Sequence, residues 1–263
     1  MKLEIPKFAT DKELFTYLKE NREELIFQKM AQFKKADGFS APVLSQIPID
    51  GIAIKSDGSE PNSIKVRSII NTTYIMDSHK DVHIDGLWKK SLSENKRIKH
   101  LQEHDMSFKS VIADKDDLKA YTKTYSWRDL GYDVDGKTEA LVFDSVVKES
   151  RNSTMYKEYK DGNVDNHSVG MYYVKVALAF DSKDEEYQEE KAEFDKHFER
   201  IANKDAVKKN KYFFAVYEAK AIEGSAVPMG SNPITPTLGV KSDTFEKTEA
   251  ELKAEAIKKW IAK

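Results

Sequence analysis

The stretch NHSVGMYYVKVALAF, residues 166–180, decides the fold of this chain. Branched and aromatic residues dominate it, which is typical of a β-strand. Residues two apart share one side of a pleated strand, so Val176 and Leu178 would lie on the same side as Ser168. Gly170 leaves room for a backbone or a substrate to approach closely. The sequence therefore predicts a strand that begins at a serine, inside a domain rich in strands.

Similar short apolar stretches recur on both sides of this strand. Apolar and polar residues alternate over 47–53 and 64–70, and turn residues such as Asp135-Gly136 separate later stretches. Further strands are expected at 97–102, 109–113, 117–125, 139–147 and 211–227, and short helices at 84–94 and 153–160. We therefore expect a mainly β (α+β) domain over 45–240, with a charged helical insertion at 181–210.

Helical patterns occupy the two ends of the chain. Thr10 and Glu13 form a capping-box pattern, and apolar residues near helical spacing follow it, so a helix is expected over 10–36. A second, highly charged helix is expected over 244–263. The predicted organisation is an N-terminal helical extension and linker at 1–44, the β domain at 45–240 and a C-terminal charged helix at 241–263.

The amino-acid composition excludes some functional classes and disfavours others. The chain has 263 residues, with 43 Lys and Arg against 45 Asp and Glu, and this near balance disfavours a nucleic-acid binder. The absence of cysteine excludes disulfides, thiolate metal sites and a cysteine nucleophile. No apolar run approaches the roughly 18 residues of a transmembrane helix, and the first residues lack the apolar segment of a secretory signal. The expected compartment is the cytoplasm of the cell that makes the chain.

Three polar residues stand in strand contexts that suit catalysis. His104 follows the apolar positions Ile98 and Leu101, and histidine suits a general base because its ordinary pKa is about 6.5. Ser168 could act as a nucleophile, and Glu223 lies between apolar strand residues, where a buried carboxylate needs a partner. Each also has a purely structural interpretation: a histidine bonded to a turn, a common Ser-x-Gly, or a carboxylate that faces solvent.

The other histidines suggest one alternative. His79 and His83 are four residues apart, which on a helix would suit zinc, but the aspartates around them favour a loop. A metal-dependent hydrolase built on these two residues with His104 and Asp105 stays open as a less favoured hypothesis. His197 lies in the charged insertion and is expected to be a solvated surface residue.

In their order along the chain, these motifs resemble the HK97-type phage prohead proteases, which mature viral capsids. The matching segments are an Asp-rich stretch before Gly86-Leu-Trp-Lys-Lys-Ser-Leu92, Glu103-His-Asp105, a short helix ending at Gly162, His167-Ser-Val-Gly170, and Ile222-Glu-Gly-Ser225 followed by Pro228 and Asn232-Pro233. The resemblance covers roughly residues 65–240. The chain departs from the family at Leu87-Trp88, where Ala-Phe is usual, and at Gly224, where an aliphatic residue is usual.

The resemblance implies a closed β-barrel related to the herpesvirus assemblins. It implies that Ser168 is the nucleophile and His104 the base. Glu223 matches the acidic position that would orient the imidazole. Asp105 is a rival for that last role, although as the next residue on a strand it would point the opposite way.

The general mechanism of serine hydrolases also requires donors that stabilise the oxyanion. The backbone N–H groups of Val169 and Gly170, which follow the serine, are the candidates for the oxyanion hole. No metal ion and no cofactor are expected.

The same resemblance implies a viral serine endopeptidase that cleaves the major capsid protein, its scaffold segment, other prohead proteins and itself. Such an enzyme would act inside the assembling prohead in the host cytoplasm. It would associate with copies of itself and bind neither nucleic acid nor membranes. A catalytically inactive capsid-assembly or scaffold protein with the same fold is the alternative from another functional class.

Overall fold

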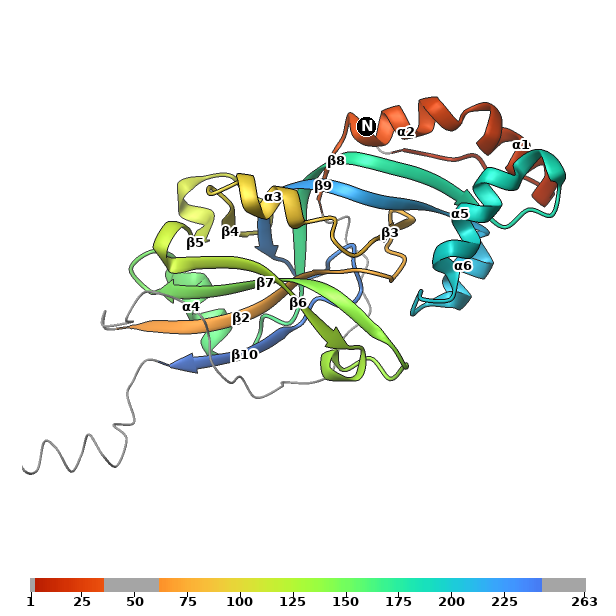
Figure 1. Cartoon of the computed structure of the whole chain (residues 1–263). Helices are drawn as coiled ribbons and strands as arrows, with labels where there is room; N and C mark the ends of the chain where they lie inside the picture. The colour runs from red at the N-terminus through yellow and green to blue at the C-terminus, as the bar shows by residue number, and fades with distance from the viewer. Residues whose placement is uncertain (1–2, 36–61, 243–263) are drawn as a thin grey trace, which may run out of the picture.

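The computed structural model describes residues 3–35 and 62–242 (Figure 1). The expected strand at 47–53, the helix at 244–263 and the predicted domain boundary at 45 lie outside the described residues. These three expectations stay predictions.

Strands and helices follow the expected order. The strands are β1 (Phe33–Lys34), β2 (Ser63–Thr72), β3 (Asp81–His83), β4 (Lys99–Gln102), β5 (Val111–Ala113), β6 (Leu118–Ser126), β7 (Lys137–Lys148), β8 (His167–Phe180), β9 (Tyr212–Ala226) and β10 (Thr237–Ser242). The helices are α1 (Asp11–Glu20), α2 (Arg22–Met30), α3 (Lys89–Glu94), α4 (Ser153–Lys160), α5 (Gln188–Phe198) and α6 (Lys204–Asn210). The strands expected between residues 64 and 227 are all present, with small shifts at their ends. β1, β3 and β10 were not expected, and β3 corrects the loop predicted around His79 and His83, because Asp81 and His83 pair with β9.

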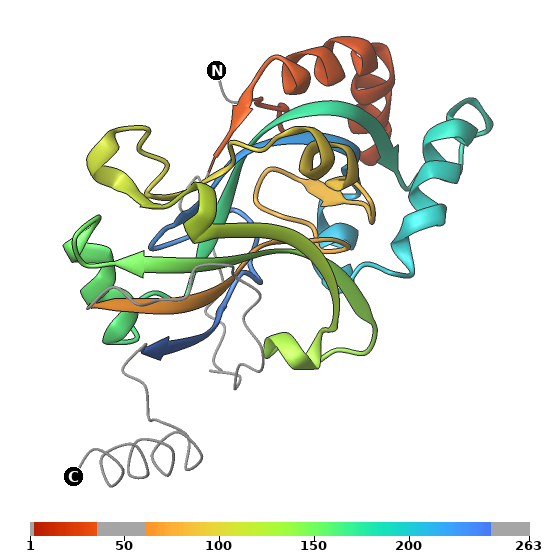
Figure 2. The ribbon, with the colours of Figure 1, turned by 60° about the vertical axis from the view of Figure 1, so that its left-hand side comes forward.

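The closed β-barrel is wrong for the described residues. The strands form two open sheets, one in the order β1-β8-β9-β4-β5 with β3 also paired to β9, the other in the order β10-β2-β7-β6. β5 and β6 follow each other in the chain yet belong to different sheets. In Figure 2 the long β8 and β9 ribbons curve above β2, β6 and β7. Alternation of apolar residues indicates the buried face of a strand but not whether edge strands pair, so it could not test closure.

The two sheets bury a shared core between them. Ile70 of β2 and Phe143 of β7 belong to the same buried cluster as Met171 of β8 and Ala221 of β9. At Gly224 of β9, a Cβ atom would lie 2.6 Å from the Phe143 ring and 2.7 Å from the Ile70 side chain. These two side chains fill the space that an aliphatic residue would need, which accounts for a glycine at this position.

The N-terminal segment is two helices where one was expected, and it packs into this core. Thr10 and Glu13 form the predicted capping box at the start of α1. Asn21 ends α1 and begins α2. Phe15 and Leu18 of α1 are buried in the same cluster as the strand residues, so the segment is a structural part of the folded body.

The charged insertion also folds as two helices, α5 and α6. Phe194 and Val207 are buried in a cluster with Phe213 of β9. His197, expected at the surface, is 3% exposed and hydrogen-bonds the Tyr217 hydroxyl at 2.6 Å. That expectation is wrong because a charged sequence does not reveal which side of a helix faces the sheet. Across the described ranges, no helix is long and apolar enough to cross a membrane.

Candidate active site

His104 is placed by a tight turn at the end of β4. β4 runs parallel to the end of β9, with Gln102 beside Ala226, and Glu103 donates its N–H to the Ala226 carbonyl at 2.9 Å. Glu103 and His104 then both adopt left-handed backbone angles, with φ of 54° and 56°. Residues other than glycine rarely adopt this conformation, and it recurs at functional sites. The turn brings the His104 backbone N–H to Ser225 Oγ at 3.1 Å, which holds His104 against β9.

His104 and Glu223 come together as the sequence predicts. His104 Nδ1 lies 2.6 Å from Glu223 Oε1, and the two side chains are 4% and 1% exposed. Ser225 donates its hydroxyl to the other carboxylate oxygen, Oε2, at 2.6 Å. Because the carboxylate accepts the Nδ1 proton, a neutral imidazole keeps its lone pair on Nε2. That tautomer is the one a general base requires.

Ser168 lies on the neighbouring strand, directly opposite Ser225 in the antiparallel β8–β9 ladder. Opposed residues point to the same face, with Cβ atoms about 5 Å apart, so both hydroxyls share the face that carries Glu223. Ser168 is 1% exposed, and its Oγ has no hydrogen-bond partner in the described part of the chain. The Ser225 hydroxyl donates a hydrogen bond to Glu223, whereas the Ser168 hydroxyl does not. Ser168 is also not hydrogen-bonded to His104, a bond that often tightens only when substrate binds.

Gly170 lies opposite Glu223 in the same ladder. A Cβ atom at Gly170 would lie 1.8 Å from Glu223 Oε1 and 2.7 Å from the Phe33 ring. The missing side chain therefore provides the space that the carboxylate occupies. The part that Val169 and Gly170 would take in an oxyanion hole stays a prediction.

Phe33 and Ser225 belong to this site, but no role in it was predicted for either, and Ser225 appeared only as the last residue of the Ile222-Glu-Gly-Ser225 motif. Ser225 is two residues from Glu223 on one strand, so strand alternation could have placed the two on one face. Phe33 lies on β1, which pairs with β8 through Tyr172. Its ring and Glu223 Oε1 both lie within 3 Å of the same point beside Gly170. No local pattern predicts a contact between segments so distant in sequence.

Asp105 does not orient His104, and it is not on a strand. The residue lies in the turn after β4, and its carboxylate accepts hydrogen bonds from Ser110 Oγ at 2.6 Å and from Ser107 N–H at 2.9 Å. These bonds, with that of Ser110 the strongest cause, lower the pKa of Asp105 to about 2. The expectation that strand alternation points it away from His104 fails, because β4 ends at Gln102.

The four residues of the metal hypothesis are not brought together. His79, His104 and Asp105 do not belong to any cluster of three potential metal ligands in the described residues. Another cluster does have its ligand atoms within 4.8 Å of one another, and it is fully buried. It consists of Asp77, Asp81 and His83.

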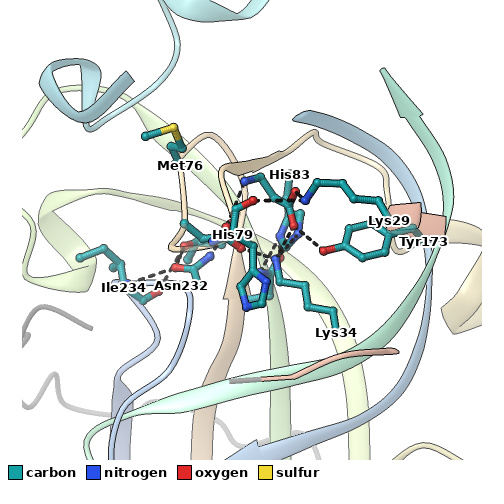
Figure 3. Close-up of polar contacts among 12 residues, drawn as sticks. Lys29, Lys34, Met76, His79, His83, Tyr173, Asn232 and Ile234 are labelled. Atoms are coloured by element: carbon teal, nitrogen blue, oxygen red, sulfur yellow. Dashed lines mark hydrogen bonds and ion pairs between the residues drawn. The ribbon is translucent and has the colours of Figure 1, made fainter. Parts of the chain in front are cut away.

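The Lys34 ammonium of β1 contacts all three members of this cluster (Figure 3). Lys34 pairs with Asp77, and its Nζ lies 2.8 Å from Asp81 Oδ2 and 3.4 Å from His83 Nε2. Lys29 of α2 also pairs with Asp81. An ammonium thus takes the contacts that a metal ion would need, and the cluster joins the N-terminal segment to the sheets.

Burial and the neighbouring charges together shift the pKa values of the groups in this cluster. Burial alone would favour neutral groups, but Asp77 and Asp81 outweigh it and hold the pKa of Lys34 above its ordinary value. Burial likewise opposes the charge of Asp81, yet Lys29 and Lys34 hold its pKa well below the ordinary range. Burial lowers the pKa of His83 far below its usual value, so this imidazole is neutral and accepts from Lys34.

We expect Lys34→Met to destabilise the protein by about 3–5 kcal/mol, because it leaves the buried Asp77 carboxylate without the cation that it pairs with. The neighbouring Lys35 is exposed, so Lys35→Met removes the same charge without breaking a buried pair and serves as the matched control. Urea denaturation at neutral pH measures both. A loss below about 1 kcal/mol for Lys34→Met would mean that the pair does not hold the N-terminal segment.

A second group of buried polar side chains, linked by hydrogen bonds, begins at His167, the residue before Ser168. His167 donates its Nδ1–H to the Thr235 carbonyl at 3.0 Å, and its Nε2 lies 2.9 Å from the Tyr159 hydroxyl. The same hydroxyl lies 3.1 Å from His100 Nε2, and His100 Nδ1 lies 2.9 Å from Ser145 Oγ. One proton arrangement satisfies every bond: Ser145 donates to His100, which donates to Tyr159. Tyr159 then donates to His167, and both imidazoles are neutral.

The two neutral, buried histidines of this hydrogen-bonded group make the stability of the folded protein sensitive to acid. Burial lowers the pKa of His167 to about 4, and lowers that of His100 well below its ordinary value. The unfolded chain binds these protons near pH 6.5, so stability is present above that pH and is lost as the pH falls toward 4. For His167 alone, the free energy of unfolding should fall by about 3 kcal/mol between pH 7 and pH 4.

The measurement compares urea denaturation of wild type and His167→Gln at the two pH values. Glutamine can both donate and accept but does not titrate in this range. The wild type should lose about 3 kcal/mol more than the variant. Equal losses would assign the acid sensitivity to other groups.

Comparisons of this chain with protein-family models, with curated proteins and with solved structures returned no match.

Proposed function

We propose that the chain is a serine endopeptidase of viral head maturation, with Ser168 as nucleophile, His104 as general base and Glu223 as the residue that orients the imidazole. The observation that carries the proposal is the buried 2.6 Å contact between His104 Nδ1 and Glu223 Oε1. It leaves Nε2 as the basic nitrogen, and the Ser168 hydroxyl, on the strand that pairs with β9, makes no hydrogen bond with a described residue.

The reaction follows from these roles. Nε2 of His104 accepts the Ser168 proton as Oγ bonds to the carbonyl carbon of the scissile peptide. The developing oxyanion would be stabilised by the Val169 and Gly170 N–H groups. The imidazolium, stabilised by Glu223, then gives its proton to the leaving amine, and water releases the acyl group by the same steps.

Substrate access requires a local movement. Ser168 is 1% exposed and the His104 side chain 4% exposed, so a peptide can reach them only when covering residues shift. The Phe33 ring packs beside Glu223 at Gly170.

The proposed substrates are the major capsid protein with its scaffold segment, other prohead proteins and the chain itself, inside the assembling prohead in the host cytoplasm. Self-association is part of the proposal, and nucleic acid and membranes are not among the partners. These assignments come from the resemblance of the His104, Ser168 and Glu223 motifs to prohead proteases.

The test is co-expression of the full chain with the major capsid protein of the same virus, wild type against Ser168→Ala. We expect mass spectrometry to find a shortened capsid protein only with the wild type. Intact capsid protein in both would favour an inactive assembly protein. Cleavage that stops with a chelator and returns with zinc would favour the metal-dependent hydrolase.

A further inference from the structure

Lys29 of α2 contacts Asp81 of β3 deep inside the protein. The two side chains are 4% and 0% exposed, and the Lys29 Nζ also donates to the His79 carbonyl at 3.2 Å. The rings of Phe214 and Tyr173 lie 4.3 Å and 5.2 Å from Nζ. Figure 3 shows Lys29 and the Tyr173 hydroxyl pointing into the same cluster of polar side chains. An amine and a carboxyl group therefore meet among aromatic rings, in a place that water does not reach.

The second oxygen of the Asp81 carboxylate receives two other donors. Lys29 contacts Oδ1, whereas Oδ2 accepts from the Tyr173 hydroxyl at 2.6 Å and from Lys34 Nζ at 2.8 Å. Burial raises the pKa of Tyr173 well above its ordinary value, so its hydroxyl keeps the proton that it donates. Two fixed donors on one oxygen are the arrangement that stabilises an oxyanion when a nucleophile adds to the adjoining carbon.

The two lysines of the cluster differ in how firmly each holds its charge. Burial opposes the charge of both ammonium groups. At Lys34, Asp77 and Asp81 outweigh burial and hold the pKa above its ordinary value. Lys29 pairs only with Asp81 in the described part of the chain, and burial lowers its pKa. Lys29 is therefore the nitrogen that gives up a proton more readily, and Lys34 the one that stays a cation.

We propose that Lys29 and Asp81 condense into an isopeptide bond within the folded chain and release one water molecule. An ammonium and a carboxylate supply every atom of the amide and of the water, so the reaction needs no co-reactant. The site also protects its product, because exclusion of water prevents hydrolysis of the amide. The bond would join α2 to β3 across 52 positions of sequence, whether or not the chain is a peptidase.

The reaction begins with a proton that passes from Nζ of Lys29 to Oδ1 of Asp81 along their contact. This step leaves a neutral amine and a neutral carboxyl group, which a buried site favours over two charges. The Nζ lone pair then bonds to Cγ, and the π electrons of the carbonyl move to Oδ2, where Tyr173 and Lys34 stabilise the negative charge.

Loss of water completes the amide. A second proton leaves Nζ of Lys29 for Oδ1 of Asp81. Asp77 can relay this proton, since one of its oxygens lies within 4.8 Å of an oxygen of Asp81. The carbonyl at Oδ2 re-forms, the bond from Cγ to Oδ1 breaks, and Oδ1 departs as water. The nitrogen keeps one proton, as an amide requires.

The experiment follows the intact mass of the purified full-length chain during incubation at neutral pH. We expect the mass to fall below that of the sequence by one water molecule. After trypsin digestion, tandem mass spectrometry should find peptide 23–34, uncut at Lys29, joined to peptide 81–89. Lys29→Arg keeps a buried cation beside Asp81 but supplies no neutral amine, so this variant should keep the full mass.

The Tyr173 donor gives a second, kinetic test. Tyr173→Phe should slow the loss of water about a hundredfold, because one donor to the oxyanion is removed. The next residue, Tyr172, is 43% exposed, so Tyr172→Phe is the matched control and should keep the wild-type rate. An unchanged rate in Tyr173→Phe would overturn the part of this hydroxyl in the reaction.

A wild-type chain that keeps its full mass throughout the incubation would overturn the proposal. So would a loss of water without the joined peptide, such as a cyclic imide at Asp85-Gly86, or a loss that persists in a folded Lys29→Arg variant. Should Lys29→Arg not fold, the joined peptide in the wild type and the rate of Tyr173→Phe decide the outcome.

Discussion

Replacement of Ser168 with alanine should lower kcat for peptide cleavage by about six orders of magnitude, because the covalent step has no other nucleophile. The folded state should be retained, since the Ser168 hydroxyl has no hydrogen-bond partner among the described residues to lose. Removal of an unpaired buried hydroxyl is expected to be neutral or slightly stabilising. The measurement pairs single-turnover cleavage of a peptide identified from the capsid digest with the unfolding midpoint of the variant.

Ser225→Ala provides the matched control on the opposite strand. Ser225 donates to Glu223 and accepts from the His104 backbone, so its loss should disturb the position of both groups. One hydrogen bond to a charged group corresponds to about a ten- to hundredfold loss in rate. If Ser225→Ala proves inactive and Ser168→Ala retains activity, the nucleophile has been assigned to the wrong strand.

Much of the fold follows from residue patterns. Strands β2 and β4 to β9 appear where branched and aromatic residues alternate with polar ones, because that pattern fits a half-buried pleated surface. Closure of the sheets could not be predicted, because it depends on which edges meet. The edge of β8 is taken by Phe33–Lys34 from the N-terminal segment. A strand of two residues carries no periodicity, so the residue pattern predicted only a helix for this segment.

In the candidate site, too, some features could be predicted from the sequence and others could not. Glu223 could be predicted to need a partner, since a carboxylate between apolar strand residues must be paired when buried. His104 could be placed at a strand end, but the left-handed turn at Glu103 and His104 could not, because neither residue type favours it. The buried cluster of Asp77, Asp81 and His83 with Lys34 could not be predicted from the sequence either. Its lysines and aspartates come from segments that local patterns treat as a solvated helix and a loop.

Replacement of Glu223 with glutamine should lower kcat/KM by about four orders of magnitude at neutral pH, through the tautomer of His104. The amide keeps the size of the carboxylate. Its oxygen can still accept the Ser225 hydroxyl, and its NH₂ then faces His104 Nδ1. Nδ1 must then accept a hydrogen bond, so the imidazole carries its proton on Nε2. In that form it cannot take the proton of Ser168.

The flipped amide is disfavoured, because Ser225 Oγ already accepts the His104 backbone N–H and its own proton would lose its acceptor. Glu218→Gln, on the same strand but paired with Lys90 at the surface, is the matched control and should leave the rate unchanged. The double variant Ser168→Ala with Glu223→Gln should be no slower than Ser168→Ala alone, since residues that act as one unit are not additive. A Glu223→Gln enzyme within about tenfold of wild type would mean that the imidazole is oriented by another group, because loss of the correct tautomer cannot cost so little.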